Sequence, residues 1–588
     1  MIINKETVLA ELEHFSDFST SDKSFSPCFS NIGIAVDSER DGSGALWLHY
    51  NRASRKMWNK FLSFPLKQNK EKSSSWCVVY GESDRQKVSV TFSDTDTVFA
   101  SATGVAEIKI FAEADKKLRS FWIEGLNEKE IYARGFSENA DDRDPDETVP
   151  FYVKVKAIDG IFLQEKSEIK ITAENEKINF IFSFEFLETD TNTAERRIEN
   201  SPKDFCSAAE KCKSVIGSCF EELNINVPNE KAASLAANAL HGLVFNLAKA
   251  PGELKHHISS FPSRGAYPTH FLWDTCFQNL AYENMSKLLA KEFLLQFAQC
   301  QRVDGKYVQF ICSTWGRPHY SQPALVGWAT WRFYRQTGDK EFLETMLSSI
   351  EKNNSWWLSA RASEYGLVFC DHGLETGQDD SPRFDNGATY ACDMNAYVLN
   401  QLNITVKMCE ELGRKEKAEK WKKEAGKLSA SMLKYLYCEK DNIFFDLHPE
   451  TKKPVEIISP VSFLPLWAGV EICEEKAKAS IEKYLLNSEL LFGDVPFPSV
   501  AYTDSHYEDD GWWRGPTWMP NAWLMLETLQ KFGYEKEMRS AAERLLNVIL
   551  KDEKMHELFN SKTGAGLGAS QQGWTCAIFI KLCEILKK

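Results

Sequence analysis

The chain changes from one kind of secondary structure to another within residues 177–220, KINFIFSFEFLETDTNTAERRIENSPKDFCSAAEKCKSVIGSCF. At the start of this stretch Ile178, Phe180, Phe182 and Phe184 alternate with other residues, as they do in a strand with one buried face. From about residue 195 the apolar residues recur at the spacing of a helix instead. The stretch therefore separates an N-terminal sheet region from a C-terminal helical region.

The alternating pattern also precedes this stretch, in Lys87–Phe92, Glu107–Ile110 and Glu168–Ile171. Several such strands, separated by polar turns, are typical of an antiparallel sandwich. We therefore expect residues 1–195 to form an N-terminal β-sandwich domain.

The helical pattern continues from the switch to the C-terminus. Amphipathic helices bury their apolar stripes against neighbours, so roughly twelve of them are expected to stack as hairpins. We predict a helical linker over residues 196–225 and a catalytic (α/α)6 barrel over residues 226–588, which makes the chain a multidomain α and β protein. A helical solenoid is the alternative, but it requires a fixed repeat period that the sequence lacks. The expected helices lie near residues 204–222, 229–249, 275–300, 320–337, 340–361, 389–412 and 415–437.

Length and charge restrict the class of protein. A chain of 588 residues exceeds what one hydrophobic core usually supports. The net charge of −14 gives no basic field for nucleic acid. The N-terminal segment has glutamates among its apolar residues, unlike a signal peptide, and no membrane span is expected.

The 15 cysteines are an odd number without a C-x-x-C pair. Such a pattern indicates free thiols, and therefore a cytoplasmic protein, more than a disulfide framework. Cys206, Cys212 and Cys219 are the closest group, but their spacing does not match a metal site, so we expect no bound metal.

One polar segment between two expected helices carries four acids, LETGQDDSPRFD at residues 374–385. It can be a surface loop in which Asp385 or Ser381 caps a helix. It can also hold one carboxyl group protonated through neighbouring negative charge and partial burial, as a general acid requires.

A second constellation lies near the C-terminus, MHELFNSKTG at residues 555–564, followed by the QGWT of residues 572–575. Glu557 precedes a glycine-rich loop here. The alternative is an ordinary exposed glutamate at a helix end.

Two further loops have the same composition, YPTHFLWD at residues 267–274 and WWRGPTW at residues 512–518. Each places an acid or an arginine next to a tryptophan, a side chain whose flat apolar face suits a sugar ring. Each can also be a well-packed helix entry. Taken together, these loops at the starts of helices predict the mouth of one cavity.

The ordered set FLWD, SQP, ETGQDDSPRFD, WRGPTW, HELFNSKTG and GWT resembles glycoside hydrolase family 63 and the related mannosylglycerate-hydrolase-like and trehalase-like enzymes. The resemblance covers about residues 225–588. It implies that Asp379 is the general acid and Glu557 the general base. Phe384, Gln378 and Gln572 depart from the residues usual in the family, and they affect pocket walls more than the two carboxyls.

The resemblance also implies a set of sugar-binding residues, without a cofactor or a metal. With the aromatic residues of the quoted loops, the predicted substrate-binding residues are Tyr267, Phe271, Trp273, Asp274, Gln322, Arg383, Trp513, Arg514, Trp518 and Trp574.

Inverting hydrolysis needs one carboxylic acid and one carboxylate, and the predicted partner is a carbohydrate substrate. The resemblance implies an α-linked glucoside or mannoside of an oligosaccharide or small glycosyl compound. A trehalase-like enzyme or a mannosylglycerate or glucosylglycerate hydrolase is the alternative. A phosphorylase needs a phosphate pocket in place of the base, and a glycan-binding protein has no use for two unpaired buried carboxyls. The sugar, its linkage and the oligomeric state stay open.

Overall fold

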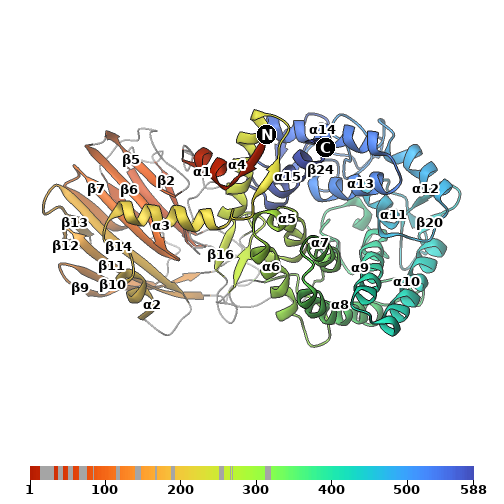
Figure 1. Ribbon diagram of the computed structural model, residues 1–588, viewed down its shortest axis with the longest axis horizontal. Helices are drawn as coiled ribbons and strands as arrows, with labels where there is room; N and C mark the ends of the chain where they lie inside the picture. Colours follow the sequence, from red (N-terminus) through yellow and green to blue (C-terminus); the bar gives the residue numbers. More distant parts are fainter. Residues whose placement is uncertain are drawn as a thin grey trace.

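The computed structural model of the protein consists of a sheet region and a helical region that lie side by side (Figure 1). The sheet region is N-terminal and the helical region C-terminal, as the switch in periodicity predicts. The structure describes residues 1–13, 32–37, 44–50, 57–64, 76–83, 85–113, 120–138, 148–165, 168–186, 192–249, 257–264, 266–267, 269–311, 320–387 and 389–587.

Two large sheets make up the N-terminal region, and every strand pairing described in them is antiparallel. The seven-stranded sheet has the order β5-β6-β7-β14-β11-β10-β9, and the six-stranded sheet has the order β12-β13-β8-β4-β3-β2. The strands are β2 (Ile32–Asp37), β3 (Gly44–Tyr50), β4 (Met57–Phe64), β5 (Val78–Ser83), β6 (Gln86–Asp94), β7 (Thr97–Thr103), β8 (Glu107–Glu113), β9 (Ser120–Leu126), β10 (Glu130–Glu138), β11 (Thr148–Asp159), β12 (Ile161–Glu165), β13 (Glu168–Thr172) and β14 (Lys177–Phe186).

Two helices between the sheet region and the inner helices cover one face of the seven-stranded sheet. The helices α2 (Asn192–Glu199), which begins before the predicted linker, and α3 (Phe205–Ser218), which lies within it, pack on β14, β11, β7 and β6 (Figure 1). Ile198 and Ala208 form a small core there with Phe99 and Ile181. This contact explains why both faces of β14 are buried, although its phenylalanine alternation predicts one buried face.

The first residues of the chain lie against the helical region. The three-residue strand β1 (Ile2–Asn4) pairs with β15 (Asn224–Asn226), and α1 (Lys5–Leu12) packs against α4 (Glu230–Phe245). Asn4 caps α1 by accepting a hydrogen bond from the Thr7 backbone N–H at 2.9 Å. Because so short a strand has no periodicity, this pairing could not be predicted from the sequence.

Six helices of the C-terminal region follow one another around a ring, and α15 returns to contact α5. These inner helices are α5 (Leu272–Met285), α7 (Val326–Thr337), α9 (Cys392–Glu411), α11 (Leu464–Ala468), α13 (Met519–Lys531) and α15 (Gly573–Lys587). Alternating with them in sequence are α4 (Glu230–Phe245), α6 (Lys287–Gln299), α8 (Lys340–Ala360), α10 (Lys415–Tyr435), α12 (Glu474–Ser480) and α14 (Glu535–Asp552).

The prediction of a single helix over residues 275–300 was wrong. The chain leaves the helical conformation at Ser286, with φ −158° and ψ 107°, and the Ser286 hydroxyl accepts a hydrogen bond from the Leu289 N–H at 3.4 Å. The break turns one amphipathic stretch into α5 of the ring and α6 outside it.

Short strands and single turns of helix order the segments that enter the inner helices. Notably, β24, β25 and β26 form one sheet, which joins the loop before α13 to the loop before α15. No helix within the described ranges is long and apolar enough to cross a bilayer. The short strands are β16 (Leu247–Lys249), β17 (Ile258–Ser260), β18 (His270–Phe271), β19 (Phe310–Ile311), β20 (Tyr437–Cys438), β21 (Ile443–Phe444), β22 (Asp446–Leu447), β23 (Pro454–Val455), β24 (Thr517–Trp518), β25 (Leu558–Phe559) and β26 (Gly566–Leu567).

Candidate active site

A cavity of about 130 Å³ lies at the N-terminal ends of the inner helices. Its lining comes from segments far apart in the chain: Pro262, Tyr267, Phe271, Trp273, Asp274, Gln309, Gln322, Leu374, Gly377, Asp379, Trp512, Trp513, Trp518, Glu557 and Trp574.

Most of the residues singled out in the sequence lie in this one lining. Arg383 and Arg514 are the two that do not. The residues that the structure brings together are Asp379, Glu557, Tyr267, Phe271, Trp273, Asp274, Gln322, Trp513, Trp518 and Trp574.

Tryptophan rings form much of the cavity wall. The rings of Trp513 and Trp518 stack in parallel, with centroids 3.7 Å apart and an interplanar angle of 7°. The Trp273 ring meets the Trp574 ring edge to face at 5.7 Å. The backbone N–H of Trp273 donates to the Gln322 side-chain oxygen at 3.0 Å, which ties two loops of the wall together. Such a wall of flat apolar faces with a few polar groups is the expected form of a sugar site.

Of the four acids in the 374–385 segment, Asp379 is the one that lines the cavity. Glu375 accepts hydrogen bonds from Arg361 and Ser321, and Asp380 accepts one from the Trp513 N–H at 2.7 Å. Asp385 pairs with Arg514. The Asp379 side chain is exposed at the cavity, but the protein around it removes part of its hydration, and this raises its pKa. The negative charge of Asp380 raises the pKa of Asp379 further.

Glu557 is buried at the cavity and has two hydrogen-bond donors. Its Oε2 accepts from the Ala569 N–H at 3.1 Å and from the Tyr267 hydroxyl at 3.5 Å. Burial raises the pKa of Glu557 to about 7, and the charge of Asp379 acts in the same direction, whereas the two donors lower it. Gly568 leaves room for this carboxylate, because a Cβ there would lie 2.7 Å from the Glu557 Oε2.

A third carboxyl, Asp274, lies in the first turn of α5 and is 4% exposed. Burial and the charge of Glu557 raise its pKa well above the ordinary range. The phenol of Tyr267 has a raised pKa for the same reasons, so it stays a proton donor. The cavity therefore combines three acids and a tyrosine hydroxyl, groups able to bind sugar hydroxyls and transfer protons.

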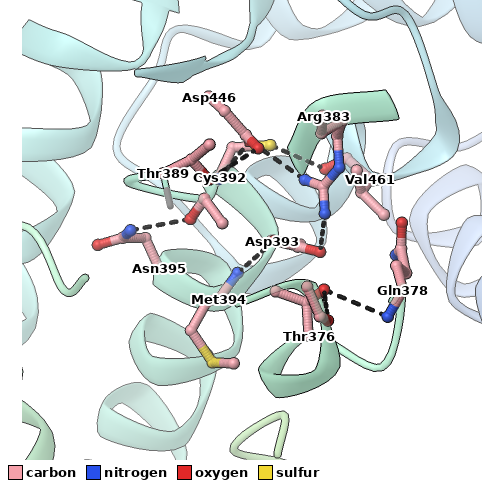
Figure 2. A network of polar contacts seen from close by, with 12 residues as sticks. Thr376, Gln378, Arg383, Thr389, Cys392, Asp393, Met394, Asn395, Asp446 and Val461 are labelled. Carbon is pink, nitrogen blue, oxygen red and sulfur yellow. Dashed lines mark hydrogen bonds and ion pairs between the residues drawn. The ribbon is translucent and has the colours of Figure 1, made fainter. Parts of the chain in front are cut away.

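Arg383, predicted to bind substrate, is not among the residues that line the cavity. Its guanidinium is buried and donates to Asp393 at 2.7 Å and to Asp446 at 3.1 Å (Figure 2). Asp446 also accepts from the Cys392 N–H at 2.8 Å, at the start of α9. The two aspartates lie outside residues 374–385, so these ion pairs join that segment to α9 and β22.

Arg514 is also placed differently from the prediction. It pairs with Asp385 and thereby joins the 512–518 loop to the segment that carries Asp379. Its side chain is 21% exposed. In the described structure, both arginines of the quoted motifs therefore form ion pairs that join segments of the chain.

Sequence reasoning missed five lining residues. Gly377 has a φ of +77°, and a Cβ there would lie 2.6 Å from the Trp273 ring. Its position as the glycine of the E-x-G motif could therefore have marked it as a residue of the cavity wall. Leu374 and Trp512 stood inside quoted motifs. Pro262 and Gln309 carry no pattern that marks them. Among the residues that the structure describes, no three His, Cys, Asp or Glu side chains form a group that could hold a metal ion.

Known proteins resemble parts of this chain. The mannosylglycerate hydrolase MGH1 of Selaginella moellendorffii is 25% identical over 405 residues, which are 54% of this chain and 81% of that protein. The cytosolic neutral trehalase of Kluyveromyces lactis is 26% identical over 195 residues, 31% of this chain and 26% of that protein.

The fold is also similar to that of a solved structure. The glycoside hydrolase family 63 mannosylglycerate hydrolase from Thermus thermophilus, in complex with glucose, superimposes with a TM-score of 0.53. The match covers 59% of this chain and 99% of that one, at 18% identity. The family model for the mannosylglycerate hydrolase MGH1-like glycoside hydrolase domain matches residues 267–575, more than half of the chain. The chain therefore belongs to this family and is a glycoside hydrolase.

Proposed function

We propose that the protein is an inverting α-glycosidase in which Asp379 is the general acid and Glu557 the general base. The observation that carries this proposal is the cavity itself, which is walled by tryptophans and holds two carboxyls of raised pKa from segments far apart in the chain. Raised pKa values in a cleft are typical of catalytic groups.

In this mechanism Asp379 gives its proton to the glycosidic oxygen as the bond to the anomeric carbon breaks. Glu557 takes a proton from a water molecule that attacks the same carbon from the opposite face. An α-linked substrate then yields a β-configured sugar and a free acceptor hydroxyl. We expect the two carboxyl groups to be about 6.5–9.5 Å apart, the separation that leaves room for the water.

The productive form has the proton on Asp379 and the charge on Glu557. The negative charge of Asp379 raises the pKa of Glu557, so the ionisation of the two carboxyls is linked. The Ala569 N–H and the Tyr267 hydroxyl favour the charged form of Glu557. These two donors therefore support its assignment as the base.

We further propose that the scissile bond is an α-glucoside or α-mannoside of a small glycosyl compound. The relatives named as mannosylglycerate hydrolases and a trehalase support a small substrate. A trehalase-like or glucosylglycerate-hydrolase activity is the alternative. A glycan-binding protein without turnover is the candidate from another class.

The same proposal includes an (α/α)6 barrel as the catalytic domain, supported by the closed succession of inner helices. We assign residues 1–195 to a β-sandwich domain, 196–225 to a helical linker and 226–588 to the barrel. The free thiols among the described cysteines support a cytoplasmic location.

A substrate panel tests the activity. Mannosylglycerate, glucosylglycerate, trehalose and α-linked oligosaccharides are incubated with the enzyme, and released monosaccharide is measured. Proton NMR of the first-formed sugar is expected to show the β-anomer before mutarotation. Initial release of the α-anomer contradicts inversion, and absence of release from the whole panel favours the binding protein.

A further inference from the structure

Glu375 is a fully buried carboxylate four residues before Asp379. It does not line the cavity, and both of its oxygens are occupied. One oxygen accepts from the Ser321 N–H at 3.1 Å, the Ser321 hydroxyl at 3.0 Å and the Arg361 guanidinium at 2.5 Å. The other accepts from the Asp371 N–H at 3.0 Å. One side chain therefore joins the end of α8, the turn at Asp371 and the segment before α7.

The contact with Ser321 and the backbone around Glu375 both connect to residues that line the cavity. Ser321 precedes Gln322, whose side-chain oxygen accepts from the Trp273 N–H at the start of α5. On the other side, the Gln378 N–H donates to the Gly373 oxygen at 3.2 Å, and the Ser381 N–H donates to the Gln378 oxygen at 3.2 Å. These bonds make residues 373–381 one hydrogen-bonded unit. We therefore expect a displacement of Glu375 to move Asp379 as well.

We propose that Glu375 is a positioning residue whose carboxylate, held by Arg361, fixes the segment carrying Asp379 relative to the segment carrying Gln322. The inference rests on the proposed role of Asp379 as the general acid. Glu375 contacts neither the cavity nor the reacting atoms, so its effect on the reaction passes through the placement of the acid.

The chain offers a matched control. Asp371 pairs with the same Arg361 at 2.8 Å, but on the solvent side, where its side chain is 63% exposed. Asp371→Asn removes a carboxylate from the same guanidinium without touching Ser321 or the 373–381 unit. Glu375→Gln keeps the length of the side chain and removes the charge that holds Arg361.

The test compares two substrates for each variant of the full chain. One has a poor leaving group, mannosylglycerate or trehalose, whichever the wild type hydrolyses, and the other is the matching α-glycosyl fluoride. A misplaced acid matters for the first substrate and little for the second, because fluoride needs little protonation. We expect Glu375→Gln to lose about 10²-fold in kcat/KM on the poor leaving group and about 10-fold or less on the fluoride. Asp371→Asn is expected to keep both wild-type values.

An equal loss on both substrates in Glu375→Gln overturns the proposal, because lost folding or lost sugar binding affects both alike. If this variant does not fold by circular dichroism, Arg361→Lys replaces it, since lysine keeps the charge and loses the guanidinium fork. The same shift toward the fluoride is expected there, and an unchanged ratio overturns the proposal. Asp379→Asn is measured in parallel. If it shows no dependence on the leaving group, the assignment of the acid has failed, which is a different outcome from a failure at Glu375.

Discussion

Two groups of carboxyls in the helical region are equally buried and yet have different surroundings. Glu557 and Asp274 are 3% and 4% exposed at the cavity, where no arginine or lysine contributes to the described lining. Glu375 and Asp446 are 0% and 2% exposed, and each pairs with an arginine, Arg361 or Arg383.

Burial alone therefore does not determine what a carboxyl does in this protein. Beside an arginine a buried carboxylate is paired, and it holds segments of chain together. At the cavity, desolvation is opposed by a few hydrogen-bond donors, and the pKa rises toward the range useful for proton transfer. Neutralising a carboxyl of each group is expected to have opposite effects on stability.

The largest effect is expected from Glu557→Gln on activity. Water must be activated whatever the leaving group is, so hydrolysis of a disaccharide and of a glycosyl fluoride should both fall by about 10²- to 10⁴-fold. Steady-state rates on both substrates measure this. Glu553→Gln, an exposed glutamate that pairs with Lys231, is the matched control and should keep wild-type rates. Rates in Glu557→Gln near those of the control would remove Glu557 from the chemistry.

Asp446→Asn should lower the free energy of unfolding by about 3–5 kcal/mol, the cost of removing one partner of a buried ion pair. Arg383 would keep Asp393 as its remaining carboxylate. Denaturant unfolding measures the change. Asp371→Asn, which breaks an ion pair with an exposed carboxylate, should change stability by at most about 1 kcal/mol. If both variants lose the same free energy of unfolding, a buried carboxylate paired with arginine contributes no more to stability than an exposed one.

Glu557→Gln should have the opposite effect on stability at pH 8. The folded-state pKa of Glu557 is raised from 4.5 to about 7, so its contribution to stability is complete below pH 4.5 and is lost as the pH rises through 7. The variant stays neutral and avoids this loss, which amounts to about 3 kcal/mol. Thermal unfolding at pH 8 and pH 4.5 is the measurement. A gain at pH 8 that disappears at pH 4.5 is expected, and a variant less stable than the wild type at pH 8 would contradict the comparison.

The smallest effect is expected from Tyr267→Phe. The Tyr267 hydroxyl lowers the pKa of Glu557, so its removal should raise that pKa and move the acidic limb of the kcat/KM profile to higher pH. A shift of about 0.5–1 pH unit corresponds to one hydrogen bond. An unmoved limb would mean that Tyr267 does not bond to the ionised base.

Much of this arrangement could be predicted from the sequence, because the relevant signals are local. The alternation before residue 186 and the helical spacing after it placed both regions. The motif order brought residues as distant as Trp273 and Trp574 into one cavity. The residues predicted correctly to line the cavity lie in the quoted motifs themselves, so their position follows from the loop that carries them.

What the sequence did not reveal depends on partners from elsewhere in the chain. Arg383 belongs to a motif, but Asp393 and Asp446 determine its position, and only folding brings them to it. Likewise, the apolar pattern continues on both sides of Ser286, so it does not show the break there. The break separates α5, which belongs to the ring of inner helices, from α6, which lies outside the ring.

The central claim is that Asp379 differs from the acids beside it because it alone among the four acids of residues 374–385 lines the cavity. The most direct test measures kcat/KM of Asp379→Asn and Asp380→Asn on a poor leaving group and on the matching glycosyl fluoride. Asp379→Asn should lose about 10²- to 10⁴-fold on the poor leaving group and be partly spared on the fluoride. In Asp380→Asn the amide oxygen can still accept the Trp513 N–H, so the loss should be within about 10-fold and equal for both substrates. Equal losses on both substrates in Asp379→Asn, or leaving-group dependence in Asp380→Asn instead, would contradict this account.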